Sequence, residues 1–121
     1  MKITINEIPP SMNKFNGREN SWEYRNEKRR WTDTVCLLAK CQQNRTGESF
    51  EKAKVSLTYY FQDSRRRDPD NYAGKLILDG LTKAGVIADD DFDHITLEIK
   101  KGGVDKENPR TEVEITKGAE V

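Results

Sequence analysis

Apolar and polar residues alternate in four short stretches of the chain, and this alternation is typical of a strand with one buried face. The clearest stretch is 54–62, where Val55, Leu57 and Tyr59 share one side of the predicted strand. The other three stretches are residues 2–8, 95–100 and 113–115. Four strands of this kind predict a sheet that packs on a core through one face only.

Two longer stretches repeat apolar residues at the spacing of an amphipathic helix. The first helix is predicted to begin after Ser21, a residue type that commonly caps helix N-termini. The second is predicted over about residues 72–84, with Asp70 or Asn71 as its cap and Gly85 at its end.

The predicted order of elements is therefore βαβαββ. Gly102 and Gly103 are expected to lie in a loop between the last two strands. Two helices on one side of four strands give an α+β fold with a single mixed sheet. All of residues 1–121 are expected to belong to this one domain.

Composition adds an expectation about assembly and location. Hydrophobic residues make up 34% of the chain and charged residues 35%, which is little apolar material for a compact monomer, so we expect a homodimer. The chain has no apolar run of membrane-spanning length and no signal-peptide core near its start, so a cytoplasmic protein without membrane association is expected. In that compartment Cys36 and Cys41 are expected to be thiols.

Charge is distributed unevenly along the chain although the net charge is zero. Residues 14–67 carry 13 Lys and Arg against 7 Asp and Glu. Residues 68–121 carry 7 Lys and Arg against 13 Asp and Glu. A basic half can bind phosphate groups while an acidic half supplies a metal site. The alternative is that both halves are the solvated faces of a highly charged small protein.

The candidate chemistry lies in the stretch 65–91, where two groups of carboxylates flank the second predicted helix. Asp68 and Asp70 stand on either side of Pro69, and three aspartates at 89–91 follow the helix. We expect the helix to bring the second group back to the end of the preceding strand. The carboxylates could then share Mg²⁺, or Mn²⁺, through oxygen ligands.

Lys75, at the start of the helix, could stabilise negative charge on a phosphate at such a site. A metal site built on histidines is not expected, because His94 is the only histidine. The alternative interpretation is structural: residues 68–71 also suit a turn, and residues 89–93 could be a solvated loop.

Several basic and polar residues are candidates for contact with a phosphate backbone. They are Arg65, Arg66 and Arg67 before the first carboxylate, Arg29 and Arg30 in the first helix, and Asn13 and Lys14 after the first strand. Each has a simpler alternative. Arginines on a helix commonly form intrahelical ion pairs, and residues 11–14 could be a plain loop.

Taken together, these residues resemble the RusA family of Holliday-junction resolvases. The resemblance rests on Arg67-Asp68-Pro69-Asp70-Asn71, Lys75, Leu78-Asp79-Gly80-Leu81, Ala84-Gly85-Val86-Ile87 and Asp89-Asp90. The early segment Pro9-Pro10-Ser11-Met12-Asn13 also resembles the P-x-S-x-N loop of that family. The segments follow the family's order over most of the chain.

The resemblance implies a small homodimeric endonuclease, often encoded by a prophage, that requires Mg²⁺ and cuts four-way DNA junctions by symmetrically placed nicks. It implies that Asp68, Asp70 and Asp90 hold the metal and that Lys75 assists at the phosphate. Asn71 joins the residues expected to contact DNA.

Two spacings depart from the family pattern. The gap between Asp70 and Lys75 is one residue longer than in the commonest form, and the segment after Asp90 is also longer. Asp89 or Asp91 is therefore an alternative ligand. Two other functions stay open, namely a non-catalytic protein that binds branched DNA and a phage structural or interaction protein.

Overall fold

The sheet of the protein has four strands in the order β1-β4-β2-β3. The strands are β1 (Lys2–Ile5), β2 (Ala53–Phe61), β3 (Ile95–Val104) and β4 (Arg110–Lys117). β4 runs antiparallel to β1 and β2, whereas β3 runs parallel to β2. This computed structural model, which describes residues 1–18 and 21–118, confirms the predicted single mixed sheet.

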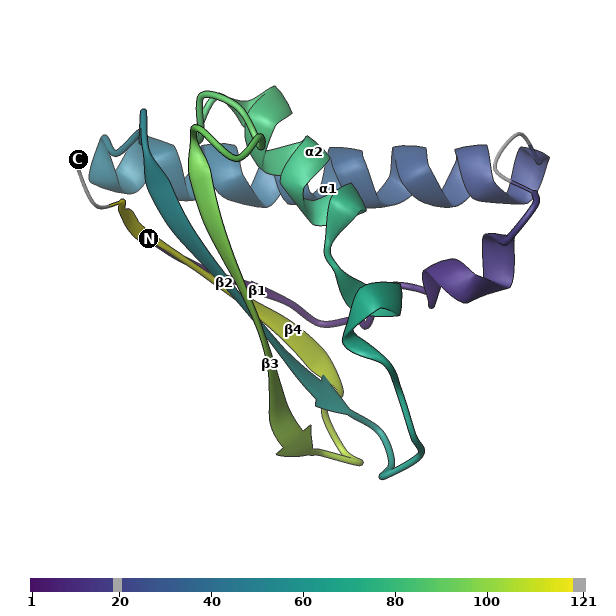
Figure 1. The fold of residues 1–121 in the computed structure, drawn as a ribbon. Coiled ribbons are helices and arrows are strands. Elements are labelled where there is room, and N and C mark those ends of the chain that lie inside the picture. The colour runs from purple at the N-terminus through teal and green to yellow at the C-terminus, as the bar shows by residue number, and fades with distance from the viewer. Residues whose placement is uncertain (19–20, 119–121) are drawn as a thin grey trace.

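Two helices cover the same face of the sheet (Figure 1). They are α1 (Trp22–Thr46) and α2 (Lys75–Ala84), preceded by the short 3-10 turns η1 (Met12–Phe15) and η2 (Pro69–Tyr72). The order of strands and helices is the predicted βαβαββ. In the described part of the chain, neither helix combines the length and apolar character that crossing a membrane would require.

The start of α1 follows the prediction, because the side chain of Ser21 accepts a hydrogen bond of 3.1 Å from the backbone of Tyr24. The start of α2 differs from the prediction. Its N-cap is Gly74 in a left-handed conformation, with φ of 82°, whereas the predicted caps Asp70 and Asn71 lie in η2. Glycine is required at this bend, since its positive φ disfavours a side chain and a Cβ there would lie 2.2 Å from Leu57.

The predicted loop at Gly102 and Gly103 is also wrong. β3 continues to Val104, and a β-bulge opposite β2 accommodates the extra residue, so Tyr59 pairs with Lys101 and Tyr60 with Gly103. The added length carries the end of β3 alongside the end of β2.

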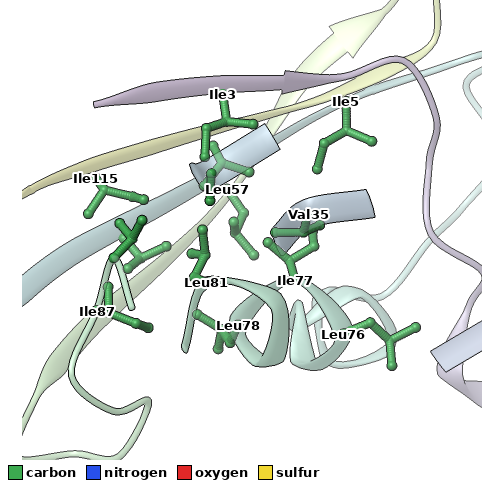
Figure 2. Close-up of a cluster of buried hydrophobic side chains, with 14 of the residues drawn as sticks. Ile3, Ile5, Val35, Leu57, Leu76, Ile77, Leu78, Leu81, Ile87 and Ile115 are labelled. Carbon is green, nitrogen blue, oxygen red and sulfur yellow. The ribbon is translucent and has the colours of Figure 1, made fainter. Parts of the chain in front are cut away.

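The hydrophobic core lies between the sheet and the two helices (Figure 2). Leu57 of β2, Val35 of α1 and Ile77 of α2 are fully buried there. The opposite face of the sheet is polar, as the alternation predicts. Cys36 and Cys41 are free thiols, as expected.

Candidate functional site

Asp68 and Asp70 follow the loop after β2, with Asp68 as the N-cap of the turn η2 and Asp70 within it. Both side chains are exposed, and Asp68 accepts a hydrogen bond of 3.3 Å from Arg66. The backbone amide of Asn71 donates to the carbonyl of Asp68, which closes the turn. Pro69 at the start of η2 restricts the backbone between the two carboxylates, so both are presented to solvent from a fixed turn.

An aromatic cluster holds this turn against the sheet. The hydroxyl of Tyr59 donates a hydrogen bond of 2.7 Å to the backbone carbonyl of Tyr72, and the Tyr72 ring also packs edge-on against Phe61. Burial raises the pKa of Tyr59 far above its usual value, so the hydroxyl keeps its proton and remains a donor. The position of Asp68 and Asp70 is thus fixed by a buried strand residue.

Lys75 is the exposed first residue of α2, directly after this turn. It lines a small hollow together with Asn71 and with Pro9, Pro10 and Met12 of the N-terminal loop. Segments more than 55 residues apart in the sequence therefore lie side by side, and both belong to the stretches that carry the family resemblance.

The aspartates at 89–91 lie at the other end of β2 (Figure 1). Their loop is tied to the chain just before β2, because Phe50 exchanges backbone hydrogen bonds with Val86 and Ala88. η2 packs against Tyr59 in the second half of β2, so the two groups of aspartates lie at different levels along this strand. The expectation that α2 returns the aspartates to Asp68 and Asp70 within one chain is wrong.

The physical reason is the direction of β3. Two neighbouring strands that run parallel must begin at the same end of the sheet, so the connection between them has to carry the chain back along its whole length. α2 makes that return, and it moves the chain away from η2.

Asp90 is half-buried in this second loop. Its pKa is raised by burial, then by its hydrogen bond with Asp89 and by the negative charge of Asp79 on α2. The spacing of residues 79 and 90 in the sequence gives no signal of this interaction. Negative charges are crowded at this end of the protein.

Asp89, Asp91 and His94 each place one donor atom so that the three lie within 4.8 Å of one another. Over residues 1–18 and 21–118 this is the one group of three such side chains, so Asp68, Asp70 and Asp90 do not gather as closely. His94 contacts Asp91, which raises the pKa of His94 and lowers that of Asp91. The sequence analysis did not predict His94 as a possible ligand. Its position three residues after Asp91 was the one sequence feature that could have indicated it.

A hollow of about 310 Å³ adjoins Asp68 at the ends of β2 and β3. Its floor is apolar, formed by Tyr59, Phe61, Tyr72 and Ile99, and its rim is basic, formed by Arg65, Arg66, Arg67, Lys100 and Lys101. We refer to it below as the basic hollow.

The three arginines of the rim differ in their contacts. Arg67 is only 18% exposed, pairs with Asp63 at 2.8 Å and stacks over Phe61 at 4.3 Å, so it organises the loop. Arg65 and Arg66 are 79% and 89% exposed, and their guanidinium groups are accessible to a phosphate.

The family model described as Endodeoxyribonuclease RusA matches residues 7–116. The chain belongs to the RusA endodeoxyribonuclease family. The match spans every residue predicted for the site, from Asn13 to Asp90. No curated protein matches the chain at a significant level. A RusA-family chain is a nuclease, a hydrolase of DNA phosphodiester bonds, so the exposed carboxylates and arginines lie on an enzyme that acts on a polyanion.

The remaining candidates for DNA contact in this RusA-family chain lie near the start of α1. Arg30 is held by Glu7 and Glu27 at 2.9 and 3.1 Å, and Lys14 pairs with Glu23 at 2.8 Å. Both side chains are therefore held in ion pairs within the chain.

Arg29 is exposed and lines a shallow hollow with Trp22, Arg25 and Asn26. Trp22 is 73% exposed beside these arginines. Asn13 is exposed in η1.

Proposed function

We propose that the chain resolves four-way DNA junctions as a homodimer, cutting by paired symmetric nicks with the help of Mg²⁺ or Mn²⁺. The family supports nuclease activity. The observation that carries the rest of the proposal is the separation of Asp68 and Asp70 from Asp90 along β2. The three carboxylates can share one ion only when two copies contribute.

A twofold dimer would satisfy this requirement twice. One site would use Asp68 and Asp70 of one copy with the partner's Asp90, and the second site would use the reciprocal set. Two equivalent sites related by a twofold axis match the symmetry of a four-way junction, which supports paired nicks over a single cut.

The residues present fit a hard divalent cation. Asp68 and Asp70 are exposed oxygen donors at one turn. The pKa of Asp90 is raised by burial, then by Asp89 and by the charge of Asp79, and a cation would offset these effects. When bound, Mg²⁺ would acidify a coordinated water and offset charge on the phosphate.

The chain's own basic residues would position the DNA. Arg65 and Arg66 would hold phosphate oxygens next to Asp68, and Lys100 and Lys101 would extend the same basic surface along β3. Lys75 would offset charge that develops on the cleaved phosphate. The proposed contact set also includes Asn13, Lys14, Arg29, Arg30, Arg67 and Asn71.

Asp70→Asn tests the proposal. It should abolish nicking of a synthetic four-way junction in Mg²⁺ by at least a hundredfold, while junction binding in EDTA stays within twofold of the unmutated protein. Asp33→Asn is the matched control, since Asp33 is an exposed aspartate on α1 that pairs with Lys83, and it should nick normally.

Two results would contradict the proposal. Full nicking by Asp70→Asn would remove Asp70 from the site. An unmutated protein that binds branched DNA but never nicks it in Mg²⁺ or Mn²⁺ would establish the non-catalytic binding protein instead.

A further inference from the structure

Trp22, the first residue of α1, keeps 73% of its surface exposed. It lines a hollow of about 170 Å³ together with Arg25, Asn26 and Arg29. Residues at these spacings lie on one face of a helix, which we call the tryptophan face. Trp31, the other tryptophan of the chain, is buried in the core. Tryptophan and arginine are the residue types most enriched where proteins bind their partners.

The two arginines of the tryptophan face are available to an anion. Among the residues that the structure describes, neither Arg25 nor Arg29 has an ion-pair partner. Arg30 of the same helix, by contrast, is held by two glutamates at 2.9 and 3.1 Å. Because the chain belongs to a family of DNA nucleases, DNA is the anion whose charge complements this face.

The indole ring limits the form of DNA that can bind here. A tryptophan binds a nucleotide by stacking on the flat face of its base. Inside a duplex both faces of a base are covered by the neighbouring base pairs, so the ring can stack only on an unpaired base. Arg25 and Arg29 lie one and two helical turns from the ring, where they can hold the phosphates of the same strand. The amide of Asn26 can hydrogen-bond the edge of the base.

The tryptophan face is connected through η1 to the turn that bears Asp68 and Asp70. Tyr24 of α1 packs edge-on against Phe15 of η1, with 5.2 Å between the ring centroids. η1 in turn lies against η2 (Figure 1). The tryptophan face shares no residue with the basic hollow, so the two surfaces can bind different segments of one DNA molecule at the same time.

We propose that the tryptophan face binds unpaired nucleotides of branched DNA, with a base stacked on Trp22 and phosphates held by Arg25 and Arg29. The inference rests on the proposed function in one respect, because it adds a class of substrate to the same enzyme. Branched DNA that carries a single-stranded arm should bind more tightly than a fully paired junction.

The first test measures binding of a fluorescein-labelled oligothymidylate in EDTA by fluorescence anisotropy. Trp22→Ala should raise the dissociation constant at least fivefold, because the stacked base is lost, while the circular dichroism spectrum stays unchanged. Trp22→Tyr keeps a stacking ring and should stay within threefold of the unmutated protein. Leu37→Ala is the matched control, since Leu37 is 65% exposed about four turns further along α1. An unmutated protein that does not bind the oligothymidylate, or a Trp22→Ala variant that binds as well as the control, would overturn the inference.

The same titration with a blunt duplex separates stacking from charge. Trp22→Ala should leave duplex binding within twofold of the unmutated protein. Arg25→Gln should weaken binding of both ligands by a similar factor, because both contain phosphates. Equal losses of duplex and single-strand binding in Trp22→Ala would overturn the inference.

Tryptophan fluorescence reports the contact directly. Exposed Trp22 should emit at longer wavelength than buried Trp31, so unlabelled oligothymidylate should quench the long-wavelength component alone. Sedimentation equilibrium tests whether the face binds protein instead. If Trp22→Ala changes the oligomeric state and leaves oligothymidylate binding intact, the inference fails.

These measurements are independent of catalysis. If Trp22→Ala loses oligothymidylate binding but the unmutated protein nicks no DNA in Mg²⁺ or Mn²⁺, the tryptophan face stands and the proposed function fails. If the protein nicks four-way junctions while Trp22→Ala binds oligothymidylate normally, the function stands and this inference fails.

Discussion

The hydroxyl of Tyr59 donates a 2.7 Å hydrogen bond to the backbone carbonyl of Tyr72. This bond joins the buried face of β2 to the turn that presents Asp68 and Asp70. A residue in the core of the sheet therefore fixes the position of exposed carboxylates that it does not touch.

Tyr59→Phe should lower the free energy of unfolding by about 1–2 kcal/mol, because the Tyr72 carbonyl loses its donor. Nicking should fall further than stability explains, since the turn is held less firmly. Urea denaturation and single-turnover nicking at saturating protein check the two effects. Tyr60→Phe is the control, because Tyr60 lies on the opposite face of the sheet against Arg110. Equal nicking by both variants would contradict a positioning role for Tyr59.

A mixture of Asp70→Asn and Asp90→Asn proteins should regain nicking although each is inactive alone. In a heterodimer, one site receives Asp70 from one copy and the partner's Asp90 from the other, and so is intact. Random exchange makes half of the dimers heterodimers with one working site, so about a quarter of the unmutated nicking rate is expected. The products should be nicked junctions, not resolved duplexes.

If both carboxylates acted within one chain, no heterodimer would contain an intact site and the mixture would stay inactive. The measurement is nicking by the mixture after equilibration, compared with each variant alone at the same total concentration.

Arg66→Ala should weaken DNA binding, whereas Arg67→Ala should lower stability. Arg66 is highly exposed, so its loss should weaken junction binding several-fold and reduce the steepness of the salt dependence without changing stability. Arg67 is held by Asp63 and Phe61, so its loss should destabilise the loop. Binding isotherms at several salt concentrations and thermal unfolding distinguish the two variants. Identical profiles for both would contradict the division of roles.

Asp63 should titrate below the usual range of aspartate. Its pKa is lowered by the backbone amide of Arg65, then by the side chain of Arg67. A carboxyl whose pKa is depressed in the folded state contributes stability above its unfolded pKa of about 3.9, and that contribution is lost as the pH falls through the folded pKa. The ordering of the loop around Arg67 should therefore weaken in acid.

The carboxyl chemical shift of Asp63, followed by NMR, measures this directly. In Arg67→Lys the charge is kept but the paired guanidinium contacts are lost, so the midpoint should move up toward the ordinary value. An ordinary midpoint in the unmutated protein would contradict the prediction.

Gly80→Ala should destabilise the protein by about 1–3 kcal/mol through overpacking between the helices. A Cβ at Gly80 of α2 would lie 2.6 Å from the Cβ of Val35 on α1. Combining the change with Val35→Gly should cost less than the sum of the two single changes, because both the Cβ and the Cγ1 of Val35 that the new methyl group would meet are removed. Additive unfolding free energies from urea denaturation would show that Gly80 is not a close-packing position.

The sequence by itself determined the elements and the residue types of the site. Alternation at Val55, Leu57 and Tyr59 identified the strand that the structure places inside the sheet. Helical periodicity and Ser21 identified α1, because these patterns depend on neighbours that are close in the chain. Local signals failed where a distant contact decides the conformation, as at Gly74, whose backbone passes against Leu57.

Only the tertiary structure decided where the carboxylates lie relative to one another. Spacing along the chain placed Asp68 and Asp70 on one side of a helix and Asp90 on the other, but it did not show which way the next strand runs. Because β3 is parallel to β2, the helix must return the chain to the start of β2, and this moves Asp90 away from η2. Strand direction is set by the pairing of residues far apart in sequence, which periodicity does not encode.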